Sequence, residues 1–485
     1  MNVARYLAVL FSAFVLAAAS GCGGGSDGGN NQTLPPTAGI SGIGIASGPI
    51  TTFGSVVVNG VRYETDAAAF TVNDSPGTQA DLSVGQVVLI KGSVNDDGTS
   101  GTADEVIFDD NVKGPIDNID LALNQLTVLG QLVLVTATTS FDDSISPASL
   151  EGLSEGDIVE VSGFFSSFGD IEATRIEKKP AGTQFEVHGL VSNLDAANLT
   201  FSINALVVDY SSATLDDFTG GQPADGDFVE AKGNSIGAAG ELIADSVELE
   251  SGISGDQGDH VEIEGLITRF VSETDFDVSG LPVTTNGGTV FEGGVAADLG
   301  LNIKVEVEGE LDANNVLIAD KVDIRRGKVV RSVAVVDSVD AANNSLVMLG
   351  ITFTTDELTR FEDKSDADVR PLTINDINMG DYLEIRGTEF PAGSGQVQAT
   401  ILEREDLDSR TILQGFVESI ADPTLVILGV TIDTTGAVFR DVDDSVITST
   451  EFFNLVGVNT LVKARGTEAG DTMITATEVE LELEL

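Results

Sequence analysis

Residues that carry much of protein chemistry are scarce in this chain of 485 residues: it has one cysteine, two histidines and no tryptophan. A single cysteine, Cys22, cannot form a disulfide within the chain. A histidine-based zinc site usually takes two or three ligands in one place, whereas His188 and His260 are well separated in the sequence. We expect both histidines at the surface or at a strand edge. With one cysteine and two separated histidines, the chain lacks the groups that thiol catalysis and catalytic triads require. The sequence therefore predicts a protein that is not an enzyme.

Basic residues are also few. The chain has 24 lysines and arginines against 78 aspartates and glutamates, and its formal net charge is −54. A surface this negative repels the phosphate backbone of nucleic acids and suits cationic partners. We therefore expect no nucleic-acid partner.

An apolar run near the start of the chain ends in the phrase Ala19-Ser20-Gly21-Cys22. This phrase resembles the bacterial lipobox, in which the cysteine thiol is acylated and becomes the mature N-terminus. The run is too short for a comfortable transmembrane helix, which needs about 20 apolar residues. We therefore expect residues 1–21 to be a lipoprotein signal peptide and Cys22 to carry the lipid.

A glycine-rich stretch follows the cysteine. Residues 22–45 are typical of a flexible tether that holds a folded region off a membrane. By the sorting rules of lipoproteins, Gly23 in place of an aspartate favours the outer membrane of a Gram-negative bacterium. The expected membrane contact is thus a lipid anchor in the cell envelope, periplasmic or surface-facing, and we expect no later stretch to span a bilayer as a helix.

Six strand-like stretches each close on a glycine, about 70 to 80 residues apart. Seven residues before each closing glycine stands another glycine or an asparagine. This regularity predicts six copies of one small module. The closing residues are Gly92, Gly163, Gly233, Gly309, Gly387 and Gly466, and the residues seven positions earlier are Gly85, Gly156, Gly226, Asn302, Gly380 and Asn459.

The stretch before each closing glycine alternates between apolar and polar residues. In the second module, Val159 and Val161 are expected on one face of a strand, and Glu160 and Ser162 on the other. Another strand should follow, in which an alanine stands three residues before an aliphatic residue. We expect the small residue to let two strands approach closely. The pairs are Ala103 and Val106, Ala173 and Ile176, Ala244 and Val247, Ala319 and Val322, Ala399 and Leu402, and Ala476 and Val479.

About five short strands per module cannot cover a core as an open sheet, but a closed barrel hides both edges and the apolar face. We therefore expect an all-β protein, a tandem array of about six small closed β-barrels, OB-like or SH3-like. An outer-membrane β-barrel would need strands of about 9–11 residues and girdles of aromatic residues, so a chain of short strands without tryptophan is not expected to form one. We expect short connections to join the barrels like beads, although neighbouring barrels could still pack together. The expected barrels are 46–112, 113–179, 186–250, 260–326, 328–406 and 411–485.

At this point the chain resembles a known family. The lipobox, the tether and the phrase at residues 48–61 are similar to a bacterial family of tandem lipoprotein domains, a domain of unknown function of the DUF5666 type. The phrase at residues 156–163 fits it too, and the resemblance covers nearly everything after the tether. It implies a fold and no catalytic residues, because its motifs are apolar and glycine-based. The later modules depart from the pattern at Ala205, Asn302, Ala334 and Asn459.

Carboxylates are the only plentiful functional groups, and they cluster in loops after the second hairpin of several modules. Loop oxygens of this kind can bind calcium, and the weak candidate ligands are Asp142, Asp143, Asp441, Asp443 and Asp444. Solvated, charge-rich loops are the simpler interpretation, and no other cofactor is expected.

The sequence therefore favours a non-enzymatic, lipid-anchored protein of the cell envelope that presents small barrels for binding or as a spacer. Its partner would be an envelope protein or a polymer. The alternatives are an acidic-loop protein that binds calcium or polysaccharide and a hydrolase that uses carboxylates, since acid and base pairs meet only in the fold.

Overall fold

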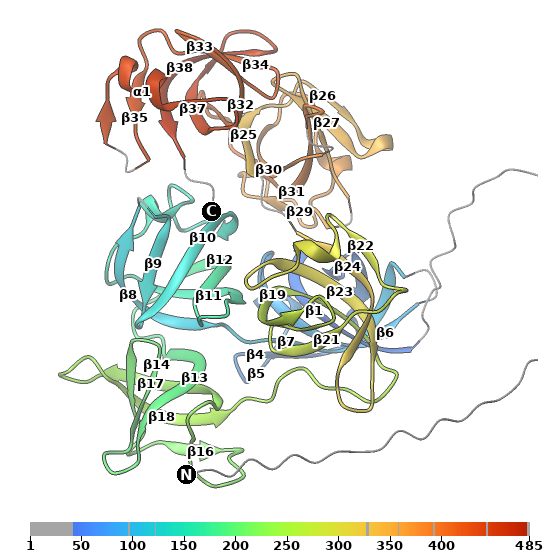
Figure 1. The fold of residues 1–485 in the computed structure, drawn as a ribbon, viewed down its shortest axis with the longest axis vertical. Coiled ribbons are helices and arrows are strands. Elements are labelled where there is room, and N and C mark those ends of the chain that lie inside the picture. Colours follow the sequence, from blue (N-terminus) through green and yellow to red (C-terminus); the bar gives the residue numbers. More distant parts are fainter. Residues whose placement is uncertain are drawn as a thin grey trace, which may run out of the picture. The chain divides into compact units, whose positions relative to one another are not determined.

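Each module closes a ring of five strands, as the pairings of the first module show, and Figure 1 shows how the strands are arranged. In the first, β1 (Gly42–Thr52) pairs antiparallel with β2 (Val56–Val58), and β2 pairs antiparallel with β3 (Val61–Glu64). Strand β3 runs parallel to β7 (Ser100–Phe108), and β7 is antiparallel to β6 (Val87–Val94). Because β6 pairs back with β1, the sheet has no free edge at the ring.

The other five rings repeat this order, with one parallel pair between the third and last strands. It is the strand order of an OB-like barrel rather than an SH3-like one, and the prediction of six small closed β-barrels is confirmed. In ring order, the strands of the second barrel are β8 (Val112–Asp120), β9 (Gln125–Val128), β10 (Gln131–Phe141), β12 (Ile171–Lys179) and β11 (Ile158–Phe165), and those of the third are β13 (Phe185–Asp195), β14 (Thr200–Ile203), β15 (Leu206–Asp209), β18 (Leu242–Leu249) and β17 (Phe228–Ile236). Those of the fourth barrel are β19 (His260–Ser272), β20 (Asp275–Val278), β21 (Leu281–Thr284), β24 (Leu317–Ile324) and β23 (Lys304–Leu311). Those of the fifth are β25 (Val329–Val335) continued by β26 (Ser338–Asp340), β27 (Ser345–Met348), β28 (Ile351–Thr354), β31 (Gln396–Glu405) and β30 (Tyr382–Glu389), and those of the sixth are β32 (Thr411–Ala421), β33 (Thr424–Ile427), β34 (Val430–Asp433), β38 (Met473–Leu481) and β37 (Leu461–Glu468).

The structure is a computed structural model that describes residues 42–95, 98–121, 123–325, 329–356, 358–390, 393–442 and 445–482. The predicted signal peptide and lipidation site lie outside these ranges. Residues 42–45, which the sequence assigned to the tether, already belong to β1, because they pair with β6. Within these ranges, no helix combines the length and the apolar character needed to cross a bilayer.

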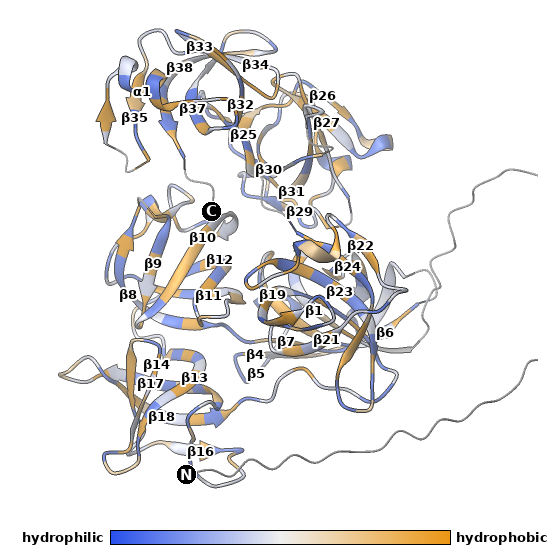
Figure 2. Ribbon diagram, in the orientation of Figure 1, coloured by the Kyte–Doolittle hydropathy of each residue, from blue (hydrophilic) through white to orange (hydrophobic). Residues whose placement is uncertain are grey.

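Apolar residues alternate with polar ones along the strands, as the colours of Figure 2 show. Val159 and Val161 point into the second barrel and are fully buried, as the sequence predicted. The same holds for all six alanines that precede an aliphatic residue and for their aliphatic partners. The second and third barrels share one cluster of core residues, and so do the fifth and sixth.

The closing glycine of every module sits at a β-bulge. The register shifts just before it, and the glycine then stands opposite the alanine of the last strand, as Gly163 does opposite Ala173. A Cβ on Gly163 would lie 2.2 Å from the backbone oxygen of Glu172 and 2.9 Å from the Cα of Ala173. The glycine and the alanine are therefore the two sides of one close backbone approach.

The residue seven positions earlier adopts the left-handed conformation in all six modules. Its φ is +86° at Gly156, +62° at Asn302 and +67° at Asn459. Asparagine is among the few residues with a side chain that tolerate this region. The two asparagines that depart from the glycine pattern thus keep the same backbone turn.

In five of the six barrels, a short helical turn precedes the strand that bears the closing glycine, such as β11 of the second barrel. It is a 3-10 turn in four barrels, as at η2 (Leu150–Gly152), and an α-helix, α1 (Ser449–Leu455), in the sixth. In the second, fifth and sixth barrels the turn contains a buried apolar residue, which is Leu150, Ile374 and Phe452 respectively. An extra short strand runs parallel to the last strand in five barrels: β4 (Ala69–Val72), β16 (Thr214–Asp216), β22 (Val290–Glu292), β29 (Arg360–Asp363) and β35 (Val438–Arg440).

The barrels are joined two by two through their opening strands. Strand β8 pairs antiparallel with β13, and β25 with β32, which unites the second barrel with the third and the fifth with the sixth. Strand β1 pairs parallel with β19, so the first barrel joins the fourth rather than its sequence neighbour. Neighbouring barrels therefore pack together, which the sequence had left open, because half of each opening strand extends beyond its own hairpin partner and is free to pair with another barrel.

Candidate functional site

Of the acidic loop residues proposed as calcium ligands, the structure describes Asp142, Asp143 and Asp441, and it does not bring these three into one site. Asp142 accepts a hydrogen bond at Oδ1 from the backbone of Ser144, and Asp441 accepts one from the backbone of Val442. Asp143 is exposed, and Asp443 and Asp444 lie outside the described residues. Among the described residues, the groups of side chains close enough to hold a metal ion include none of these aspartates.

Both histidines are buried, with 6% of the surface of His188 and of His260 exposed. This corrects the expectation of surface or strand-edge positions. Both residues lie on opening strands, β13 and β19, and each opening strand is covered by the barrel it pairs with. The Nε2 atom of His188 lies 3.3 Å from Glu230, and that of His260 lies 3.7 Å from Glu308.

The junction between β8 and β13, with the flanking strands β11 and β17, forms what we call the 2–3 seam. Lys113 on β8 faces Glu186 on β13 in register. Glu160 of β11 and Glu230 of β17 point outward from their own barrels, as the alternation predicted for Glu160. They are nevertheless buried, since the outer face of one barrel meets that of the other here.

Three lysines neutralise part of the negative charge of the 2–3 seam, and one of them, Lys179, has its Nζ 2.9 Å from Oε1 of Glu160. The Nζ of Lys113 donates to Oδ2 of Asp110 over 2.6 Å and to Oε2 of Glu186 over 2.5 Å. The Nζ of Lys232 lies 2.7 Å from Oε1 of Glu230 and 3.5 Å from Oε1 of Glu186, and it also pairs with Asp74 of the first barrel. Bonds of this kind hold the carboxylates in fixed orientations.

The pKa values of the seam follow from burial and close charges. Burial and the neighbouring Glu186 raise the pKa of Asp110, against the opposing charge of Lys113. Burial raises the pKa of Glu230 to about 7, although its hydrogen bond with His188 opposes this. Burial alone would lower the pKa of His188, but the hydrogen bond and the charge of Glu230 raise it to about 9. Burial would also raise the pKa of Glu186, but its hydrogen bond with Glu230 and the charge of Lys113 lower it to about 2.

Among the residues that the structure describes, three overlapping groups in or beside the 2–3 seam could hold a metal ion. In each group, the candidate donor atoms lie within 4.8 Å of one another: Asp110, Glu186 and His188; His188, Glu230 and Glu250; and Asp74, Glu230 and Glu248. Sequence reasoning missed this site. The one available signal is the phrase Glu186-Val187-His188, because residues two apart on a strand share a face.

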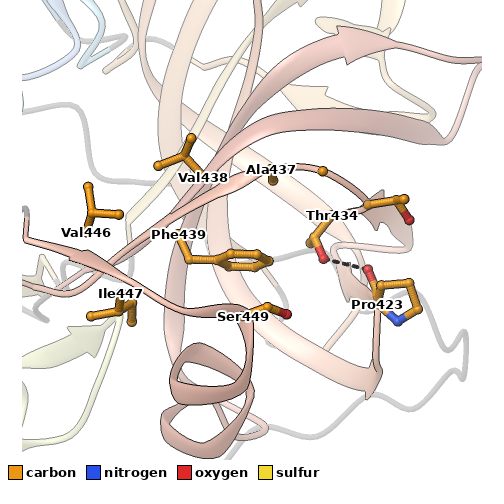
Figure 3. A pocket seen from close by; sticks show the side chains of 10 residues that line it. Pro423, Thr434, Ala437, Val438, Phe439, Val446, Ile447 and Ser449 are labelled. Carbon is orange, nitrogen blue, oxygen red and sulfur yellow. Dashed lines mark hydrogen bonds between the residues drawn. The ribbon is translucent and has the colours of Figure 1, made fainter.

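The sixth barrel has an apolar hollow of about 530 Å³ between β35, α1 and β36 (Val446–Ile447). In Figure 3, the labelled side chains around it are apolar or hydroxyl-bearing, and Thr434 donates to the backbone oxygen of Pro423 over 2.7 Å. Its lining lacks a charged side chain, whereas the potential metal ligands among the described residues lie in or beside the 2–3 seam. The hollow is lined by Pro423, Thr434, Thr435, Gly436, Ala437, Val438, Phe439, Val446, Ile447 and Ser449.

Comparison with protein families finds one family that matches six times along the chain. Its description is "Domain of unknown function (DUF5666)", and the matched residues are 45–106, 113–177, 188–248, 257–323, 333–403 and 414–480. Each match covers one of the six barrels. A search of the curated proteins found no match.

Proposed function

The chain belongs to this family of repeated domains of unknown function, and on that premise we propose that it is a non-enzymatic, lipid-anchored protein of the cell envelope. It presents six barrels to an envelope protein or a polymer, or it serves as a spacer. The observation that carries the proposal is the apolar run that ends in Ala19-Ser20-Gly21-Cys22 and leads into a glycine-rich stretch. An acylated cysteine followed by a flexible tether is a means of holding a folded domain at a membrane.

The nature of the repeat supports this role. The features common to all six modules are the bulge formed by a closing glycine and an alanine, and the left-handed residue seven positions earlier. Both are backbone devices that build a barrel and bring no reactive group. Paired opening strands then join the barrels into larger sheets, which suits a protein whose task is to present surface or to span a distance.

The balance of charge supports the choice of compartment and partner. With a net charge of −54, the protein repels nucleic acids and anionic surfaces. A lipid anchor would overcome this repulsion at a membrane, because a buried acyl chain contributes about 0.8 kcal/mol per CH₂ group. We place the protein on the outer membrane of a Gram-negative bacterium, since Gly23 rather than an aspartate follows Cys22.

Removing the thiol of Cys22 tests the anchor. In cells grown with a labelled fatty acid, we expect the wild-type protein to carry label and to fractionate with membranes. Cys22→Ala should carry none and should appear in the soluble fraction, because the acylated atom is gone. Label that persists in Cys22→Ala would refute the proposed anchor.

Two control variants separate the lipobox from a mere requirement for a thiol. Ser26→Ala, four residues further on, should be labelled like the wild type. The double variant Cys22→Ala with Ser26→Cys restores a thiol outside the motif, and it should remain unlabelled. Labelling of the double variant would show that the acylated position is not set by the phrase Ala19-Ser20-Gly21-Cys22.

A further inference from the structure

We propose that the 2–3 seam binds one divalent transition-metal ion of the zinc class through Asp110, Glu186 and His188. The three side chains come from the segment before β8 and from alternate positions of β13, and their donor atoms lie within 4.8 Å of one another. All three side chains are buried. An ion held here would connect the second barrel to the third.

Buried atoms without hydrogen-bond partners point to this site. Among the described residues, Oδ1 of Asp110 and Nδ1 of His188 are buried and form no hydrogen bond. Oε1 of Glu186 still has the ammonium group of Lys232 at 3.5 Å. Leaving a buried polar atom unpaired costs about 1–3 kcal/mol. The Glu186 carboxyl also shares a hydrogen bond with that of Glu230. The unpaired atoms that a metal ion would account for are therefore Oδ1 of Asp110 and Nδ1 of His188.

The remaining atoms of the three side chains are already held in place. Lys113 bonds Oδ2 of Asp110 and Oε2 of Glu186, which leaves the other oxygen of each carboxylate for the ion. Glu230 faces Nε2 of His188 at 3.3 Å, which leaves Nδ1. A carboxylate on the far nitrogen of a ligating histidine, and hydrogen bonds to ligating carboxylates, are the usual support around a protein metal ion. Lys113 and Glu230 are therefore positioning residues.

The donor set selects the class of metal. One imidazole nitrogen and two carboxylate oxygens suit zinc and similar first-row ions, whereas calcium takes six to eight oxygens. Binding releases the proton that Nδ1 carries when the ring is charged. The partly exposed Glu250, which shares a second potential metal group with His188 and Glu230, offers a route from solvent.

The presence of only two histidines makes the test direct. The full-length protein, labelled with ¹⁵N at histidine and stripped with a chelator, is titrated with zinc chloride and followed by NMR and by calorimetry. We expect one saturable equivalent of zinc, with a large shift of the ring signals of His188 and none of those of His260. Calcium chloride should leave both sets of signals unchanged.

Substitutions then assign the site. His188→Gln should weaken zinc binding at least 100-fold, and Glu230→Gln about 10-fold, because the latter loses only the support of the ring. His260→Gln is the matched control, since His260 is equally buried, faces a single carboxylate and also has an unbonded Nδ1. It should bind zinc as the wild type does.

Three results would overturn the proposal: no saturable zinc binding by the wild type, unmoved His188 signals at saturation, or equal loss of binding in His188→Gln and His260→Gln. The signals of the wild type decide the question even if His188→Gln fails to fold. None of these outcomes depends on the lipid anchor.

Discussion

Val161→Asp is expected to lower the free energy of unfolding of the second and third barrels by more than about 4 kcal/mol. Val161 is fully buried in the core cluster that these two barrels share. An aspartate there places a carboxylate among the apolar side chains of this cluster, and an unpaired buried charge is one of the few causes of such large effects. Urea unfolding of the full chain, followed by hydrogen exchange of peptides from these barrels, measures the change.

Val271→Asp is the control for this change. Val271 also lies on a strand, β19, but 65% of its surface is exposed. The same substitution there should alter stability by no more than about 0.5 kcal/mol. If Val161→Asp unfolds at the same urea concentration as the wild type, the inward face of β11 has been assigned wrongly.

Gly163→Ala is expected to cost about 3 kcal/mol or more, although it adds only one methyl group. The added Cβ would lie 2.2 Å from the oxygen of Glu172 and 2.9 Å from the Cα of Ala173. Both neighbours are backbone atoms of the paired strand, so the clash cannot be relieved by turning a side chain. The bulge must open, which breaks the ladder between β11 and β12. Thermal and urea unfolding measure the loss.

Gly156→Ala separates crowding from backbone strain. Gly156 has a φ of +86°, but no atom lies within 4 Å of its would-be Cβ. Alanine there meets only the cost of the left-handed conformation, about 1 kcal/mol. Gly156→Asn should cost less than Gly156→Ala, since asparagine occupies the equivalent position in two other modules. Equal losses for Gly163→Ala and Gly156→Ala would contradict the close approach at the bulge.

The barrel could be predicted from the sequence because its determinants are local. The closing glycine, the alanine opposite it and the left-handed residue are short-range backbone requirements that recur in every module. Asn302 and Asn459 replace the glycine of the other modules but keep its backbone conformation, because both residues have a positive φ. The alternation around Val161 gave the inward face correctly, since a buried face requires it.

The 2–3 seam could not be predicted, because it arises from contacts between modules. Glu160 was correctly assigned to the outer face of its strand, but nothing in its own module shows that another barrel covers that face. The pairing of β1 with β19 joins modules that are not sequence neighbours. The sequence argument compared His188 only with the distant His260. The residues grouped with it are carboxylates: Glu186 on the same strand and Asp110 in the segment before β8. A site made of common acidic residues gives little sequence signal.

The position of the seam bears on the proposed function. Strand pairing between barrels turns a string of independent domains into fewer, larger units, and a metal ion in the 2–3 seam would strengthen one of these junctions. A ligand that binds only the folded state adds stability as its concentration rises above its dissociation constant. A spacer or a display scaffold gains stiffness from such junctions, and its variable acidic loops stay free to meet a partner.

Amide hydrogen exchange in the opening strand of the first barrel tests the pairing of barrels most directly. Residues 44–47 of β1 pair with β6 on one side and with residues 260–263 of β19 on the other. Successive amides of a strand point to opposite sides, so both partners are needed to protect all of them. We expect every amide from Ile45 to Ser47 to exchange as slowly as those in the barrel core. If alternate amides exchange as fast as those of exposed loops while the others remain protected, the first barrel is closed but unpaired, and the joined-barrel account is wrong.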